Sequence, residues 1–121
     1  MVCCVREKAS AMLLARIVDS AGRPIRPDQI ATIEYFVCEP TRCSLAENRE
    51  RAERLDVDEV LLPQLVNDGS WSVDVAGYNF RHCLELDRGL QAHDSYVVVC
   101  YVFSSHDDEE SVIRFRLKLG S

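Results

Sequence analysis

Three features that would point directly to a function are missing from the sequence. Basic residues are not in excess, because 14 Lys and Arg stand against 20 Asp and Glu and the formal net charge is -6. Nucleic-acid binding requires clustered positive charge, so we expect no nucleic-acid partner. No glycine-rich loop stands between a strand pattern and a helix pattern, so nucleotide binding is not supported. Internal repeats and low-complexity tracts are also missing.

A long apolar run is missing as well. The run at residues 11–15 is too short for a signal-peptide core or a membrane span. We therefore expect no membrane partner, and a location in the cytoplasm or in an assembled particle. Without a secretion signal, the cysteines are expected to be mostly reduced, fairly apolar side chains and not a disulfide framework. The six are Cys3, Cys4, Cys38, Cys43, Cys83 and Cys100.

The sequence does contain a repeated strand pattern. Its 121 residues, 47% of them apolar, suit one domain with one core. The runs 30–38 and 96–103 are apolar on both faces and are expected in the middle of a sheet. Four other runs alternate apolar and polar residues: 12–19, 71–75, 80–87 and 112–119. About seven such strands predict an all-β, antiparallel β-sandwich over residues 11–121, preceded by an N-terminal arm at residues 1–10.

One segment has a helical pattern instead. Ser44–Glu47 matches a capping box, and two Glu–Arg pairs are spaced to meet on a helix surface. These pairs are Glu47/Arg51 and Glu50/Arg54. We predict one short exposed helix near residues 45–55 and interpret it as a solvated face. Residues 57–62, which precede a proline, are compatible with a strand or a single helical turn.

The segment 71–82 is unusually rich in aromatic and polar residues. Alternation predicts that Trp71, Val73 and Val75 point into the core, and that Gly77 marks a bend or a crossing between sheets. Three residues then remain free to present a surface: Tyr78, Asn79 and Arg81. Asn79 contributes to that surface or only bonds the bend. A second candidate surface is a basic stripe on the outer face of the last strand, formed by Arg114, Arg116 and Lys118, which meets an acidic partner or protects an exposed edge.

Candidate catalytic residues are few. His82 and Cys83 are adjacent, but successive side chains of a strand point to opposite faces, so they cannot form a dyad. We expect His82 at the edge of the core, hydrogen-bonded to backbone. No third residue has a spacing that nominates it, so we predict no catalytic residue and no enzyme activity.

Candidate metal ligands are imperfect. Cys3-Cys4 and Cys38-x4-Cys43 approximate the spacing of zinc ligands, but neither pair is followed by a second. The acidic tip at residues 106–110, which begins with His106, lacks the alternating acids and the glycine of a calcium loop. We expect no metal and no cofactor. A small ligand- or metal-binding domain that uses Cys and His residues is the alternative.

The stretch 86–100 resembles the turn into the sixth strand of immunoglobulin-like and fibronectin type III-like sandwiches, with a Leu shortly before the Tyr that begins a core strand. The resemblance implies that the Tyr96 hydroxyl ties back to the backbone at the corner between two sheets. The tryptophan that follows the first cysteine in antibody domains is missing. The segments 15–25 and 77–80 also resemble small sandwich proteins of phage and prophage virions.

These features together favour a non-enzymatic structural or interaction module. We expect a subunit of a larger assembly, such as a phage or prophage-derived particle, with other protein subunits as partners in a homo- or hetero-oligomer. The expected interaction surface comprises Tyr78, Asn79, Arg81, Arg114, Arg116 and Lys118.

Overall fold

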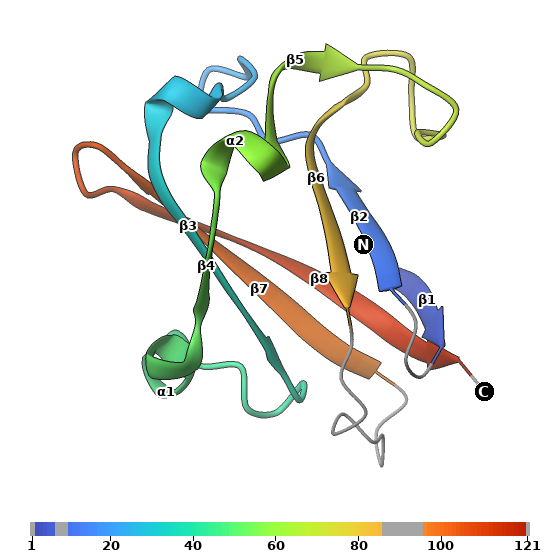
Figure 1. The fold of residues 1–121 in the computed structure, drawn as a ribbon, viewed down its shortest axis with the longest axis vertical. Coiled ribbons are helices and arrows are strands. Elements are labelled where there is room, and N and C mark those ends of the chain that lie inside the picture. Colours follow the sequence, from blue (N-terminus) through green and yellow to red (C-terminus); the bar gives the residue numbers. More distant parts are fainter. Residues whose placement is uncertain (1, 7–9, 86–95, 121) are drawn as a thin grey trace.

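The computed structural model describes residues 2–6, 10–85 and 96–120, in which eight strands form two packed sheets (Figure 1). The strands are β1 Val2–Arg6, β2 Ser10–Ala15, β3 Ile30–Cys38, β4 Glu53–Leu55, β5 Leu61–Val66, β6 Tyr78–Glu85, β7 Tyr96–Ser105 and β8 Glu110–Gly120. The short helices are η1 Pro27–Gln29, α1 Leu45–Asn48, η2 Arg49–Arg51 and α2 Val57–Val60. No helix within these residues is long and apolar enough to cross a membrane.

The strand order defines a sandwich. One sheet has the order β1-β8-β7-β3-β4 and the other has the order β2-β6-β5. All pairings are antiparallel except that of β1 with β8. The prediction of an all-β sandwich is therefore confirmed. The predicted N-terminal arm contributes β1, which lies at an edge of the larger sheet.

The core lies between the two sheets. Its largest fully buried apolar side chains are Leu13, Ile33, Leu61, Tyr78, Phe80, Leu84, Tyr101, Phe103 and Leu117. The rings of Phe80 and Tyr101 meet edge to face at 4.9 Å, which joins the sheets at their centre. The predicted central strands, β3 and β7, indeed lie inside the larger sheet.

A second, smaller apolar cluster covers the outer face of the larger sheet. It consists of Phe36, Cys38, Val98, Cys100 and Val102. The segment 43–52, which carries α1 and η2, packs against this cluster through Cys43, Leu45 and Ala52. This cover explains why β3 and β7 are apolar on both faces, since neither face is open to water.

Residues 71–77 form a loop and not the predicted strand. The side chains of Val73 and Val75 are 67% and 88% exposed, and Trp71 is half-buried against the ring of Tyr78 at 5.7 Å. The prediction that Trp71, Val73 and Val75 belong to a core strand is wrong. Alternation of apolar and polar residues is not enough to form a strand when no neighbouring strand is there to pair with it.

The side chain of Asp74 accounts for the loop. It accepts hydrogen bonds from the backbone N–H groups of Ala76 and Gly77 at 3.0 and 3.2 Å, and from Trp71 Nε1 at 3.0 Å. Arg16, which directly follows β2, adds an ion pair at 2.7 Å. The hydrogen bond to Arg16 is the main reason that the pKa of Asp74 lies far below its ordinary value, with the hydrogen bond to Trp71 next. These contacts satisfy several polar groups of the loop without sheet pairing.

The helix predicted near residues 45–55 is much shorter. Helical turns end at Arg51, and the chain enters β4 at Glu53, where it pairs with Tyr35 of β3. The Ser44 side chain forms no cap hydrogen bond, so the capping box is not made. Among the described residues Arg51 is not ion-paired with Glu47, because it donates to Asn48 Oδ1 and to the Val37 carbonyl at 2.8 and 2.6 Å. Over residues 57–62, both alternatives occur in succession, α2 and then β5.

Candidate interaction groove

Two residues of the predicted surface are in fact buried. Tyr78 continues the inward face of β6, is fully buried, and donates its hydroxyl hydrogen to Asp68 at 2.9 Å. Asn79 is also fully buried, on the other face of β6, because the hairpin at residues 17–25 covers it. The prediction that both residues present a surface is wrong. Both belong to β6, which begins at Tyr78 directly after Gly77, and each face of the strand is covered there.

The three exposed arginines do not form one surface. Arg81 points away from the core on the outer face of the smaller sheet. Arg114 and Arg116 lie opposite the outward residues Cys100 and Val98 of β7, so they are on the outer face of the larger sheet. The side chains of Lys118 and Tyr96 lie outside the described part of the chain, as do residues 86–95. The predicted surface is thus divided between opposite faces of the sandwich.

His82 and Cys83 follow the predicted parity. Cys83 is exposed, and His82 is half-buried on the inward face of β6. The partner of His82 differs from the predicted backbone group, because its Nδ1 lies 2.6 Å from the hydroxyl oxygen of Tyr101. Burial lowers the pKa of His82 and strongly raises the pKa of Tyr101, so burial favours the neutral form of each side chain.

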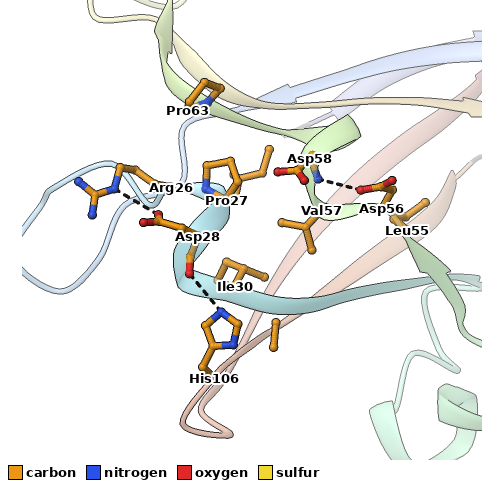
Figure 2. Close-up of a pocket in the computed structure, with 12 residues that line it drawn as sticks. Arg26, Pro27, Asp28, Ile30, Leu55, Asp56, Val57, Asp58, Pro63 and His106 are labelled. Atoms are coloured by element: carbon orange, nitrogen blue, oxygen red, sulfur yellow. Dashed lines mark hydrogen bonds and ion pairs between the residues drawn. The ribbon is translucent and has the colours of Figure 1, made fainter.

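A groove that the sequence did not reveal lies between η1, α2 and the tip of the β7–β8 hairpin (Figure 2). Its floor is apolar and includes the buried side chains of Ile30 and Leu61 and the half-buried side chains of Leu55 and Val57. The groove has a volume of about 980 Å³ and is open to solvent. This volume is at the upper end of the range of small-molecule pockets.

The rim of the groove is acidic. Asp28 comes from η1, whereas Asp56 and Asp58 lie at the start of α2 on the opposite side (Figure 2). Arg26 forms an exposed ion pair with Asp28 at 3.3 Å. Three carboxylates and one guanidinium leave a negative balance on the rim.

Local hydrogen bonds hold both sides of the groove. Pro27 begins η1, and the Gln29 side chain accepts from the Arg26 N–H at 2.8 Å, which closes the turn. On the other side, the Asp56 carboxylate caps α2 by accepting from the Asp58 N–H at 3.1 Å. These short helices place the three carboxylates around the apolar floor.

His106 closes one end of the groove. Its Nε2 lies 3.1 Å from the backbone carbonyl oxygen of Asp28. Because a carbonyl can only accept, Nε2 must carry the hydrogen. His106 therefore links the tip of the β7–β8 hairpin to η1 through this contact. Among the described residues it is not grouped with the acidic residues 107–110 as a metal ligand.

The cysteines differ from their predicted state in one respect. Cys38 and Cys43 form a disulfide with a Cα–Cα distance of 5.4 Å, so the prediction of reduced thiols is wrong for this pair. Cys100 is a buried free thiol, and its sulfur lies within 4.8 Å of both sulfurs of the disulfide. These three sulfurs are the candidate metal ligands among the described residues.

The groove and the sulfur cluster use different chemistry. An apolar floor with an acidic rim suits an apolar and basic segment of another protein. Three sulfurs within 4.8 Å of one another suit redox chemistry or a soft metal ion. In the comparisons with known proteins, no family model, no curated protein and no solved structure matches this chain.

Proposed function

We propose that the protein is a non-enzymatic interaction module and a subunit of a larger assembly, such as a phage or prophage-derived particle. Its groove takes a segment of a partner subunit that carries apolar and basic side chains. The observation that carries this proposal is the combination of the apolar floor around Ile30 and Val57 with the acidic rim.

The shape and polarity of the groove support a protein partner. The groove is open to solvent and not an enclosed cavity, which suits a segment of chain more than an enclosed small molecule. Burial of an apolar side chain on the floor would supply binding energy, at about 25 cal/mol per Å² of apolar surface. The rim charges of Asp28, Asp56 and Asp58 would favour basic partners and raise their association rate.

The strand order supports an immunoglobulin-like relationship. In that fold, strands A, B, E and D form one sheet and strands C, F and G form the other. The orders β2-β6-β5 and β8-β7-β3 have the same arrangement as B-E-D and G-F-C. Such sandwiches support many unrelated functions, so this similarity supports the architecture and not a particular partner.

The assignment to a phage or prophage particle is supported by the resemblance of residues 15–25 and 77–80. These segments are held together by Asn79, which accepts from the Ile17 N–H and donates to the carbonyls of Ile17 and Ile25. The two segments that carry the resemblance to virion proteins are thus joined to each other in the structure.

The test uses charge reversal on the rim. Asp58 is exposed and only its backbone N–H is needed for the cap, so Asp58→Lys changes the rim without removing the cap. Glu50→Lys, an exposed position outside the groove, is the matched control. The protein is co-expressed with the products of neighbouring genes, and self-association is measured by sedimentation at increasing concentration.

We expect Asp58→Lys to weaken the complex by about tenfold or more, because tenfold is about 1.4 kcal/mol and reversal replaces attraction by repulsion. Glu50→Lys should remain within about twofold, as is usual for exposed charges that touch no partner. Equal effects of the two variants would refute the groove as the binding site. A wild-type protein that stays monomeric and binds none of its neighbours would refute the interaction function.

A further inference from the structure

Two neighbouring cysteines, Cys38 and Cys43, meet the distant Cys100 on the outer face of the larger sheet. Cys38 ends β3 and lies opposite Val98 of β7, so Cys100 is its diagonal neighbour on the same face. A turn closed by a hydrogen bond from the Arg42 N–H to the Glu39 carbonyl at 2.8 Å returns Cys43 to the same place. The three sulfurs lie within 4.8 Å of one another.

This spacing is close to that of a zinc site. Zinc–sulfur bonds are about 2.3 Å long, so two sulfurs on a tetrahedral zinc ion lie about 3.8 Å apart. Once the disulfide is reduced, rotation of the Cys38 and Cys43 side chains separates these sulfurs to that distance. Cys100 already lies within about 1 Å of the required distance from both.

The surroundings of the cluster suit a zinc ion with three thiolates. Such a complex has a net charge of −1, and the guanidinium of Arg114, paired opposite Cys100 in the sheet, supplies a positive charge beside it. A mostly polar hollow of about 440 Å³ lies beside Cys38 and is lined by Glu39, Arg42 and Arg51 among others, so this side of the cluster faces polar groups.

We propose that the reduced protein binds one zinc ion through Cys38, Cys43 and Cys100, and that oxidation of Cys38 and Cys43 to the disulfide releases it. The site is additional to the interaction groove and uses none of its residues. Neither His82 nor His106 takes part, since the first contacts Tyr101 and the second contacts η1.

The redox step balances with a small disulfide, such as oxidised glutathione, as the oxidant. The thiolates of Cys38 and Cys43 lose two electrons and form the sulfur–sulfur bond. The small disulfide gains these electrons and becomes two thiolates. Zinc leaves as the hydrated ion, and the thiolate of Cys100 takes up a proton.

The first experiment measures metal binding by the full chain after reduction with a phosphine under anaerobic conditions. Zinc content is measured after removal of excess metal, and Co²⁺ is added separately because its sulfur charge-transfer band reports thiolate ligands. Cys43→Ser and Cys100→Ser each remove one ligand. Cys83→Ser, an exposed thiol on the smaller sheet, is the matched control.

We expect one zinc ion per wild-type chain and per Cys83→Ser chain. Each ligand variant should lower affinity by about tenfold or more and reduce the charge-transfer band by about one third, as expected for two thiolates in place of three. Cys43 is half-buried, so Cys43→Ser should stay folded even if Cys100→Ser does not, and circular dichroism checks both. Reduced, folded wild-type protein that retains no zinc would overturn the proposal.

The second experiment tests release. Oxidised glutathione is added to the zinc-loaded protein, and free zinc is measured with a chromogenic chelator while free thiols are counted. We expect zinc to appear as two thiols per chain are lost. Zinc that stays bound after the Cys38–Cys43 disulfide has formed, as shown by peptide mapping, would contradict the assignment of these two ligands. Loss of zinc binding in Cys83→Ser with full binding in Cys100→Ser would also contradict it.

Discussion

Removal of the Asn79 side chain should destabilise the whole sandwich. This side chain is fully buried and joins β6 to the hairpin at residues 17–25. It accepts from the Ile17 N–H at 2.6 Å and donates to the carbonyls of Ile17 and Ile25 at 2.9 and 3.0 Å. Asn79→Ala leaves the Ile17 N–H without its partner, at a cost of about 1–3 kcal/mol, and loses two donated bonds worth about 0.5–1.5 kcal/mol each.

Adding these terms overestimates the destabilisation, because the Ile17 carbonyl is not left without a hydrogen bond in Asn79→Ala. It still accepts from the Ile25 N–H at 3.0 Å. We therefore expect the free energy of unfolding to fall by about 2–5 kcal/mol, a large part of the 5–15 kcal/mol typical of a domain. In urea, with a slope of about 2 kcal/mol per M, the midpoint should fall by about 1–2.5 M.

The assay is urea unfolding followed by circular dichroism. Asn67→Ala is the control, because Asn67 is exposed and makes one bond, from Nδ2 to the Val75 carbonyl at 2.9 Å; we expect a change of about 0.5 kcal/mol or less. Asn79→Asp keeps the acceptor for Ile17 but replaces the donor by an oxygen that faces two carbonyls, so at pH 7 it should not rescue stability. A loss below about 1 kcal/mol for Asn79→Ala would refute the reasoning, since it would be much nearer to the effect of a surface substitution, about 0.5 kcal/mol, than to the expected loss.

Three further predictions concern single residues. Gly77→Ala should lower the free energy of unfolding by about 2 kcal/mol or more, because Gly77 has φ 96° and an added Cβ would lie 2.4 Å from a backbone carbonyl oxygen. Gly69→Ala is the control: the space around Gly69 is open, so this variant should be nearly neutral in the same urea assay. Burial lowers the pKa of His82 from 6.5, so the folded state favours the neutral imidazole. The stability that neutral His82 contributes is present above pH 6.5 and is lost as the pH falls from 6.5 through the folded-state pKa. In thermal melts over this pH range, the melting temperature of His82→Gln should therefore fall less with acid than that of the wild type. Trp71→Ala should lower the free energy of unfolding by about 1–2 kcal/mol, because Trp71 is half-buried on a loop and a fully buried aromatic residue would cost about 3–5 kcal/mol. A loss above about 3 kcal/mol in urea unfolding would place Trp71 in the core.

Much of the fold could be predicted because strand periodicity is a local property. Alternation identified β2, β6 and β8, and apolar character on both faces identified β3 and β7 as central. The same rule was wrong at residues 71–75, where Asp74 bonds to Arg16, which is 58 residues away in the sequence. A local pattern contains no information about such a distant partner, so it cannot distinguish this loop from a strand.

The candidate sites were harder to predict. The pair Cys38 and Cys43 could be noticed from its spacing, but Cys100 is 62 positions from Cys38 and reaches it only through the register of β3 with β7. The groove is formed by η1, α2 and the tip of the β7–β8 hairpin, which are far apart in the sequence. In the sequence its Asp residues look like those of any helix cap or turn, so they do not indicate a groove. Arg114 and Arg116 of the last strand lie on an outer face as predicted, but the face that carries Arg81 lies on the other side of the sandwich.

The sequence by itself determined the class of the fold and the apolar faces of its main strands, because period-two alternation and the balance of apolar residues are encoded along the chain. Only the tertiary structure decided which strands are neighbours, which polar residues are buried, and which side chains meet at the groove and at the sulfur cluster. The physical reason is that these contacts depend on strand register and on long-range hydrogen bonds such as those of Asn79 and Asp74. Such contacts form between residues that have no fixed relation in the sequence.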